Sequence, residues 1–191
     1  MQPVSAMRCS ICCKMEKQKP YFPMFVDLSE KQILCIGGGT IAARRIQTLT
    51  KFTDHLIVLA PEICEELGEL LDQFPITWIR RKLNPEDMIV FERGVSEEED
   101  AAKIESIEEP AFHNSYMVLA ATDDHELNHA VVKACKKRGI LVNTCDDKSQ
   151  CDYYFPAVTE VDGVMIGLNS GGKDPKKVSR VRQQIEKSVK Y

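Results

Sequence analysis

The first residues with the types and spacing for chemistry are three consecutive glycines, Gly37, Gly38 and Gly39. They follow an apolar segment, 32–36, and precede a helical pattern that starts at Thr40. A glycine turn between a strand and a helix is typical of dinucleotide sites, because it permits a tight turn and lets the backbone approach a pyrophosphate. The free N–H groups at the start of the helix would then face the phosphates. A tight turn can also need glycine for packing alone, so other residues must support a nucleotide site.

Polar residues also follow two later apolar segments, 116–121 and 140–143. Because the carboxyl ends of parallel strands meet at one edge of a sheet, we expect these residues beside the glycine turn. They are Thr122, Asp123 and Asp124 after the first segment, and Thr144, Cys145, Asp146 and Asp147 after the second. Adjacent carboxylates raise one another's pKa and suit proton transfer, which predicts an acid–base role for the second group. The alternative is that these aspartates only cap a helix or solvate a loop.

Two other patterns raise the question of a metal site. His125 and His129 frame an H-E-x-x-H pattern, but a zinc protease also needs a third ligand and a substrate cleft, so a surface helix is the better interpretation. Cys9, Cys12 and Cys13 have the spacing of half a metal site, but no second half matches it, which favours an exposed tail with oxidisable thiols. We therefore predict no metal site.

The elements that position these residues alternate strand and helix, as in a doubly wound sheet. Expected strands cover 21–28 (an edge strand), 32–36, 55–60, 76–80, 116–121 and 140–143, and expected helices cover 40–50, 61–74 and 125–137. The fold class is therefore α/β, a Rossmann-like parallel sheet with helices on both faces. A hairpin of 157–161 and 164–168 and an amphipathic helix of 175–190 follow it.

This organisation divides the chain into a cysteine-containing tail (1–19), an NAD-binding Rossmann domain (20–152) and a C-terminal segment of hairpin and helix (153–191). An acidic stretch, about 93–113, reads as a solvated insertion in the Rossmann domain. The second strand ends without the acidic residue that would bind a ribose, although Glu62 follows one step after Pro61. No arginine nearby offers to bind a 2′-phosphate, which favours NAD over NADP.

Composition narrows the function further. The chain has 191 residues, a net charge of -4 and a sequence pI near 5.6, which argue against a nucleic-acid surface. No apolar run is long enough to span a membrane and the start of the sequence has no export signal, so we expect a cytoplasmic protein. Cysteines inside apolar segments, among them Cys35 and Cys135, fit a reducing compartment.

Three stretches, GGGTIAARR, AATDDHELN and VNTCDDKSQCDYYFPAV followed by NSGGKDP, resemble the precorrin-2 dehydrogenases of the siroheme synthase family. The resemblance covers about 22–185 in the same order. It implies a Rossmann domain, a segment that crosses to a partner subunit and a small helical domain. By position it implies cofactor contacts at Gly37, Gly38, Gly39, Thr40, Ile41, Pro61, Glu62, Thr122 and Asp123, and an essential carboxylate at Asp146.

The resemblance also implies the reaction: NAD-dependent oxidation of precorrin-2 to sirohydrochlorin, with Asp146 as general base, and in some members insertion of Fe2+. Substrate carboxylates would be held by Asn143, Ser170, Gly171, Gly172 and Lys173. The apolar face of the last helix needs a partner, which predicts a homodimer. The sequence ends where relatives continue into their helical domain, which puts Fe2+ insertion in more doubt than nucleotide binding. It also keeps open a non-catalytic relative that binds NAD or a tetrapyrrole.

Overall fold

The structure is a computed structural model that describes residues 21–84, 87 and 114–188. The expectations for the cysteine-containing tail and for the acidic stretch of about 93–113 lie outside the described residues. Among the described helices, none is long and apolar enough to cross a membrane.

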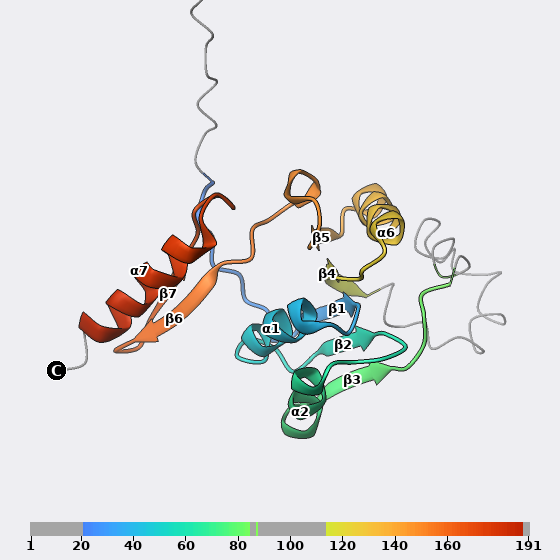
Figure 1. Ribbon diagram of the computed structural model, residues 1–191, viewed down its shortest axis with the longest axis horizontal. Helices are drawn as coiled ribbons and strands as arrows, with labels where there is room; N and C mark the ends of the chain where they lie inside the picture. The colour runs from blue at the N-terminus through green and yellow to red at the C-terminus, as the bar shows by residue number, and fades with distance from the viewer. Residues whose placement is uncertain (1–20, 85–86, 88–113, 189–191) are drawn as a thin grey trace, which may run out of the picture.

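A five-stranded parallel sheet forms the larger part of the molecule (Figure 1). Its strands, in spatial order, are β3 (Ile76–Ile79), β2 (Leu56–Leu59), β1 (Gln32–Ile36), β4 (Ser115–Ala120) and β5 (Leu141–Thr144). The chain therefore moves outward from β1 in one direction and then returns to pair β4 on the other side of β1. This reversal between β1 and β4 is the topological switch point at which α/β sheets bind ligands. The expected Rossmann-like fold is confirmed.

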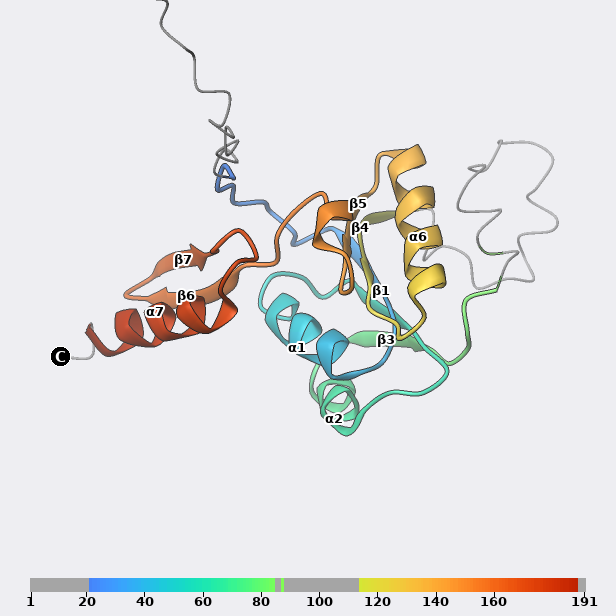
Figure 2. The same cartoon turned by 45° about the horizontal axis from the view of Figure 1, so that its top comes forward.

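Helices cover both faces of the sheet (Figures 1 and 2). On one face lie α1 (Thr40–Leu49) and α2 (Glu65–Gln73), which share a core with the side chains of Ile33, Cys35 and Leu119. On the other face lies α6 (His125–Arg138), whose Val131 and Cys135 pack on Leu34 and Val118. Because alternate residues of a strand enter opposite cores, the central strands β1, β2 and β4 are almost continuously apolar, as buried parallel strands are.

Two expected elements differ from the structure. Residues 21–28 form no strand, because β2 and β4 already occupy both sides of β1 and the segment runs along the surface with Phe22 88% exposed. The helix expected from Pro61 begins only at Glu65. Its first four residues form a turn, because the Cys64 N–H donates to the Gly38 carbonyl at 2.8 Å and ties this segment to the glycine turn.

A smaller lobe follows the sheet and consists of the antiparallel strands β6 (Ala157–Val161) and β7 (Val164–Leu168) with α7 (Pro175–Ser188). Asp162 and Gly163 both have positive φ, at 49° and 75°, which matches the twist of a two-residue hairpin turn. Helix α7 packs on β6 but has no fully buried residue. The lobe is joined to the sheet by 145–156, which contains a short 3-10 helix, η1 (Lys148–Gln150).

Candidate functional site

The glycine turn lies at the carboxyl end of β1, and its three glycines have different surroundings. Gly37 has φ +118°, and a Cβ there would lie 2.2 Å from the Ala121 carbonyl oxygen. A Cβ on Gly38 would lie 2.2 Å from the Glu62 carbonyl oxygen. A Cβ on Gly39 would meet nothing within 4 Å. Packing therefore explains the first two glycines, and the third leaves an open approach to the backbone.

The start of α1 fits a bound diphosphate. Gly39 is its N-cap and has no side chain to bond the free N–H groups of the first turn. No acidic residue lies in that turn, so the positive end of the helix dipole is not neutralised. Thr40 and Ile41 follow directly, and Ile41 is 41% exposed. The open backbone at Gly39 and the uncapped helix start together meet the requirements of a pyrophosphate cradle.

The ends of β2 and β4 border this cradle. Pro61 and Glu62 follow β2 and are exposed, and the packing of Gly38 on the Glu62 backbone brings that acidic residue beside the turn. Arg81, at the end of β3, pairs instead with Asp87 at 2.7 Å. Thr122 and Asp123 follow β4, next to Ala121, whose backbone touches Gly37. The expected cofactor residues thus lie at neighbouring strand ends.

Asp146 is connected to this edge through Asn128, a residue that the sequence reasoning missed. Asn128 is 1% exposed; its Oδ1 accepts from the Thr122 N–H and hydroxyl at 3.2 and 2.7 Å, and its Nδ2 donates to the Thr122 carbonyl at 3.0 Å. Nδ2 also donates to Asp146 Oδ2 at 2.9 Å. These contacts therefore form a continuous series from Gly37 through Thr122 and Asn128 to Asp146. The sequence did offer a signal for this role. Asn128 lies three residues after the start of a helix, and that helix begins at the end of a strand.

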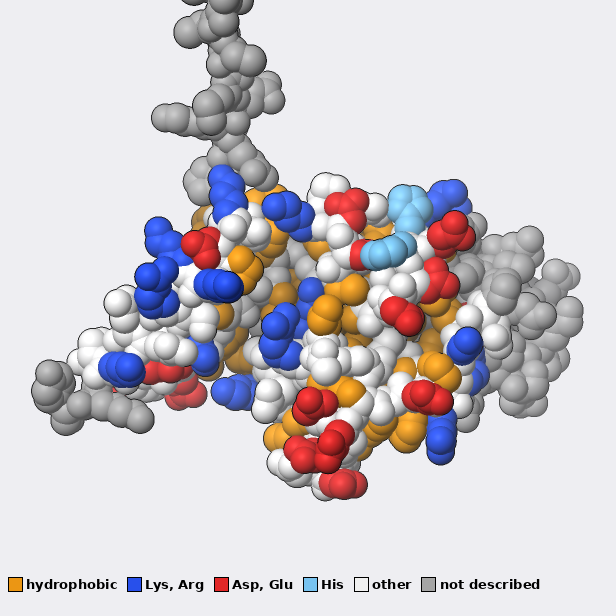
Figure 3. All heavy atoms as spheres, viewed as in Figure 1, with side chains coloured by type: hydrophobic (Ala, Val, Ile, Leu, Met, Phe, Trp, Pro, Cys, Tyr) orange, Lys and Arg blue, Asp and Glu red, His pale blue; other side chains and the backbone are white. Residues whose placement is uncertain are grey.

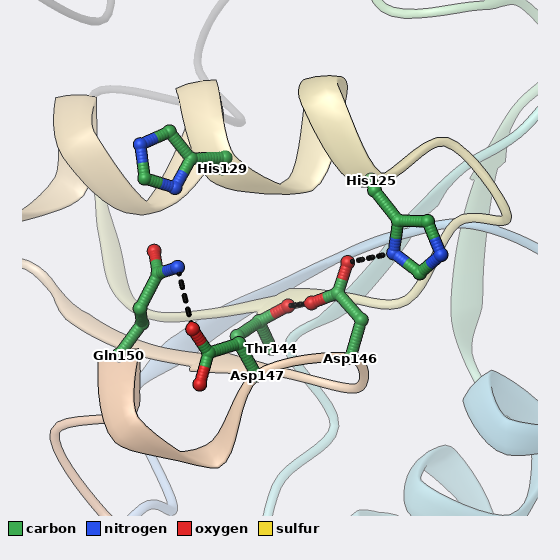
Figure 4. Close-up of a pocket in the computed structure, with 6 residues that line it drawn as sticks. All are labelled: His125, His129, Thr144, Asp146, Asp147 and Gln150. Carbon is green, nitrogen blue, oxygen red and sulfur yellow. Dashed lines mark hydrogen bonds and ion pairs between the residues drawn. The ribbon is translucent and has the colours of Figure 1, made fainter.

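The carboxylate of Asp146 is fully engaged by its neighbours. Its Oδ2 also contacts His125 Nδ1 at 2.8 Å, and its Oδ1 accepts from the Thr144 hydroxyl (Figure 4). Partial burial would raise the pKa of Asp146, but the hydrogen bonds from Thr144, Asn128 and His125 outweigh it and hold that pKa well below its usual range. Hydrogen bonds from Ser149 and Gln150 likewise lower the pKa of Asp147. The charge of Asp146 does raise the pKa of Asp147, but hydrogen bonds to the charged carboxylates outweigh this repulsion, so the expected net rise in pKa is wrong.

A cavity of about 250 Å³ opens beside Asp146. It lies between α6 and the loop after β5, and it is lined by His125, His129, Thr144, Asp146, Asp147 and Gln150 (Figure 4). Histidine side chains lie exposed next to acidic ones on this face of the molecule (Figure 3). Within the described residues, no group of three or more His, Cys, Asp or Glu is arranged to hold a metal ion. The two histidines of the H-E-x-x-H pattern both line this cavity, where His125 bonds Asp146.

The expected substrate residues occupy two places. Asn143 is 4% exposed and donates to the Tyr153 carbonyl at 2.8 Å, so its contact is with the chain itself. Ser170, Gly171, Gly172 and Lys173 form the loop before α7. A Cβ on Gly172 would lie 3.1 Å from the Tyr154 ring and 3.4 Å from the Lys148 side chain, which follows Asp147 directly. The loop therefore reaches the segment that carries both aspartates.

Comparison with known proteins agrees with this geometry. A family model described as "Putative NAD(P)-binding" matches residues 24–157, well over half of the chain. The chain belongs to this NAD(P)-binding family. The match includes the glycine turn and Asp146 but ends at the first strand of the smaller lobe.

Several relatives of this NAD(P)-binding family member are siroheme proteins. The chain is 35% identical over 167 residues to the "Probable multifunctional siroheme biosynthesis protein HemA" of Ruminiclostridium josui, covering 87% of this chain and 28% of that protein. It is 32% identical over 166 residues to the siroheme synthase of Blochmanniella pennsylvanica, covering 87% of this chain and 30% of that protein. The chain thus spans under a third of the length of these relatives. They confirm the expected resemblance to the siroheme synthase family.

A solved structure is similar in fold to most of this chain. It is named "SirC, precorrin-2 dehydrogenase"; the TM-score is 0.65 at 21% identity, and the match covers 88% of this chain and 70% of that one. At this identity the similarity supports the fold, including the smaller lobe.

Proposed function

We propose that this chain catalyses the NAD-dependent oxidation of precorrin-2 to sirohydrochlorin. One observation carries the proposal: the glycine turn with its open helix start and the hydrogen-bonded Asp146 carboxylate lie at the same sheet edge, linked through Thr122 and Asn128. The relatives named for siroheme synthesis and for precorrin-2 dehydrogenation support the choice of substrate.

In this proposal the cofactor lies with its diphosphate on the Gly37–Gly39 turn and on the N–H groups of Thr40 and Ile41. Pro61 and Glu62 lie near the ribose, where a carboxylate accepts hydrogen bonds from the two hydroxyls and repels a 2′-phosphate, so NAD is preferred to NADP. Thr122 and Asp123 line the way from the diphosphate toward Asp146. The nicotinamide, when bound, accepts a hydride from the substrate.

The substrate is a tetrapyrrole with many carboxylates, and the chain offers cations and N–H groups to hold them. Lys173, Lys148 and the Ser170–Gly172 loop lie together, as the contact of Gly172 with Lys148 requires. The Asp174 N–H donates to Ser170 Oγ at 3.0 Å, which leaves the hydroxyl hydrogen of Ser170 to donate to a ligand. Basic side chains are also frequent on the smaller lobe (Figure 3), and α7 contributes Lys176, Lys177, Arg180, Arg182 and Lys187. We propose a supporting role for Asn143, whose hydrogen bond to the Tyr153 carbonyl holds the segment after β5 in place.

We also propose that two copies of the chain form a homodimer through their smaller lobes. Its hairpin and helix bury little: α7 has no buried residue and Val164 is 60% exposed. Exposed apolar side chains also lie close to the segment 145–156 that leads into the lobe: they are Tyr21, Phe22, Met24 and Phe25, and the Tyr21 ring packs edge-on against Tyr154 with ring centroids 4.5 Å apart. Val164→Glu should convert a dimer to a monomer in sedimentation velocity, and an unchanged sedimentation coefficient would contradict this assignment.

The test of the function is an anaerobic incubation of the purified chain with precorrin-2 and NAD. We expect the absorbance of sirohydrochlorin to appear, and Asp146→Ala to reduce its rate while the Kd for NAD changes little. The same incubation with Fe2+ shows whether iron is also inserted, a step that requires loss of the pyrrole protons. NAD binding without formation of sirohydrochlorin would refute the proposed oxidation and favour a binding protein.

A further inference from the structure

We propose that His125 Nε2 is the atom that accepts the substrate proton, and that Asp146 is a positioning residue that orients the His125 ring. This inference rests on the function proposed above. It assigns a role to a histidine that the sequence pattern had suggested only as a surface residue.

The hydrogen bonds of Asp146 argue against proton transfer to its own oxygens. Oδ2 receives both Asn128 Nδ2, at 2.9 Å, and His125 Nδ1, at 2.8 Å, and Oδ1 receives the Thr144 hydroxyl. The side chain is only 15% exposed. The same bonds hold the pKa of Asp146 well below its usual range, and such a carboxylate is a weak base.

His125 has the opposite properties. Its side chain is 82% exposed and lines the cavity beside Asp146. Because Nδ1 faces the Asp146 carboxylate, the proton of the neutral ring belongs on Nδ1, and the Nε2 lone pair is then free to accept a proton. A carboxylate bonded to one ring nitrogen both fixes the tautomer and stabilises the imidazolium that forms.

The surroundings of His125 determine how its charge is balanced. From the loop after β5, Asp146 and Asp147 line the cavity. From α6 itself, His129 lines it one turn further on, and Glu126 follows His125 in the first turn. Asp124, the N-cap, is occupied by the Leu127 N–H at 3.0 Å. The direct partner of a protonated His125 is therefore Asp146.

The atoms balance in this scheme. The oxidation removes two hydrogens from the tetrapyrrole. One C–H bond breaks and its electron pair leaves as hydride to the oxidised nicotinamide, giving the reduced cofactor. The second hydrogen leaves as a proton, which forms a new N–H bond at His125 Nε2 and later passes to water from the open cavity.

The activity test compares His125→Ala and His125→Gln with His55→Ala, an exposed histidine at the amino end of β2 that pairs only distantly with Glu30, at 3.7 Å. General base catalysis contributes about 10²- to 10⁴-fold, so both His125 variants should lower kcat by at least about 100-fold. The Kd for NAD should stay unchanged, and His55→Ala should match the unaltered chain. Added imidazole should partly restore His125→Ala.

The pH profile separates the two roles. In the unaltered chain kcat should fall toward low pH, because a base that already holds a proton cannot accept one from the substrate, and this limb should be absent from the His125 variants. Asp146→Asn can keep one amide oxygen at the Oδ2 position for Asn128 and His125, but it removes the charge and the second acceptor, so it should lower kcat and retain the limb. Wild-type kcat in both His125 variants, or a limb that disappears only in Asp146→Asn, would overturn the inference.

A measurement without turnover tests the tautomer. Ring nitrogen chemical shifts of His125, assigned by their loss in His125→Gln, should place the proton on Nδ1 at high pH, and a proton on Nε2 would overturn the inference. Failure of the proposed function has a different signature, because the unaltered chain would then form no sirohydrochlorin. In that case the inference fails with it.

Discussion

The three glycines of the turn allow packing and ligand binding to be separated by three alanine variants. Gly37→Ala and Gly38→Ala would each place a methyl 2.2 Å from a backbone carbonyl oxygen. Overpacking of this kind costs about 1–3 kcal/mol, and the φ of +118° at Gly37 adds about 1–2 kcal/mol for a side chain. Both variants should therefore lose stability in urea unfolding.

Gly39→Ala should behave differently. Its Cβ meets nothing within 4 Å, and φ -82° with ψ -178° is extended backbone that any residue adopts. The exchange of an N-cap glycine for alanine costs under about 1 kcal/mol, so the protein should fold almost normally. A methyl at this point would nevertheless separate the backbone from the phosphates.

The expected weakening of NAD binding follows from the hydrogen bonds between the backbone N–H groups and the phosphates. Each hydrogen bond to a charged group is worth about 1.5–3 kcal/mol, so removal of one should raise the Kd for NAD by about 10- to 150-fold. Isothermal titration with NAD measures the Kd, and urea unfolding of the same samples measures stability. Normal NAD binding by a stable Gly39→Ala variant would refute the cradle at this turn.

Three further predictions concern the neighbouring residues. Glu62→Ala should raise the Kd for NAD by about 10-fold or more, because the ribose loses a charged acceptor, and should leave the Kd for NADP unchanged in the same titrations; equal effects on both would contradict the ribose assignment. Asn128→Ala should lower the free energy of unfolding by about 2–3 kcal/mol, since the half-buried Thr122 and the carboxylate of Asp146 lose hydrogen bonds to the buried amide, and a urea midpoint like that of the unaltered chain would be inconsistent with this network. Asp146 has a folded-state pKa below its ordinary value of 3.8, so its stabilisation is present above about pH 4 and is lost as the pH falls through the folded-state pKa. Asp146→Asn should therefore unfold more readily than the unaltered chain near neutral pH, with a difference that shrinks in acid; a pH-independent difference would argue against the charged form as the stabilising species.

The sequence was sufficient to predict the sheet because its central strands have two buried faces and are almost continuously apolar. The glycine turn and the hairpin turn were equally readable, because close backbone packing at Gly37 and Gly38 and positive φ at Asp162 and Gly163 select particular residues. The strand expected at 21–28 was wrong because the exposed aromatic side chains there have the same pattern as those of an edge strand. A strand also needs a free neighbour in the sheet, which only the topology reveals.

The sequence predicted where the site residues lie, but it did not predict the protonation state of Asp146. Strand ends place Asp146 near Thr122, but the pKa of Asp146 depends on Asn128 and His125, which approach it only when α6 packs on the sheet. Spacing along the sequence could identify neither bond. The role of each group therefore had to come from three-dimensional contacts.

The central claim is that one sheet edge holds NAD and performs the oxidation. Its most direct measurement is an anaerobic single turnover with the protein in excess over precorrin-2, in which NADH and sirohydrochlorin are followed together. The account predicts that both form at the same rate and in equal amounts, and that both rates fall together in Gly39→Ala at low NAD. Sirohydrochlorin without NADH, or no reaction in a sample that binds NAD, would contradict it.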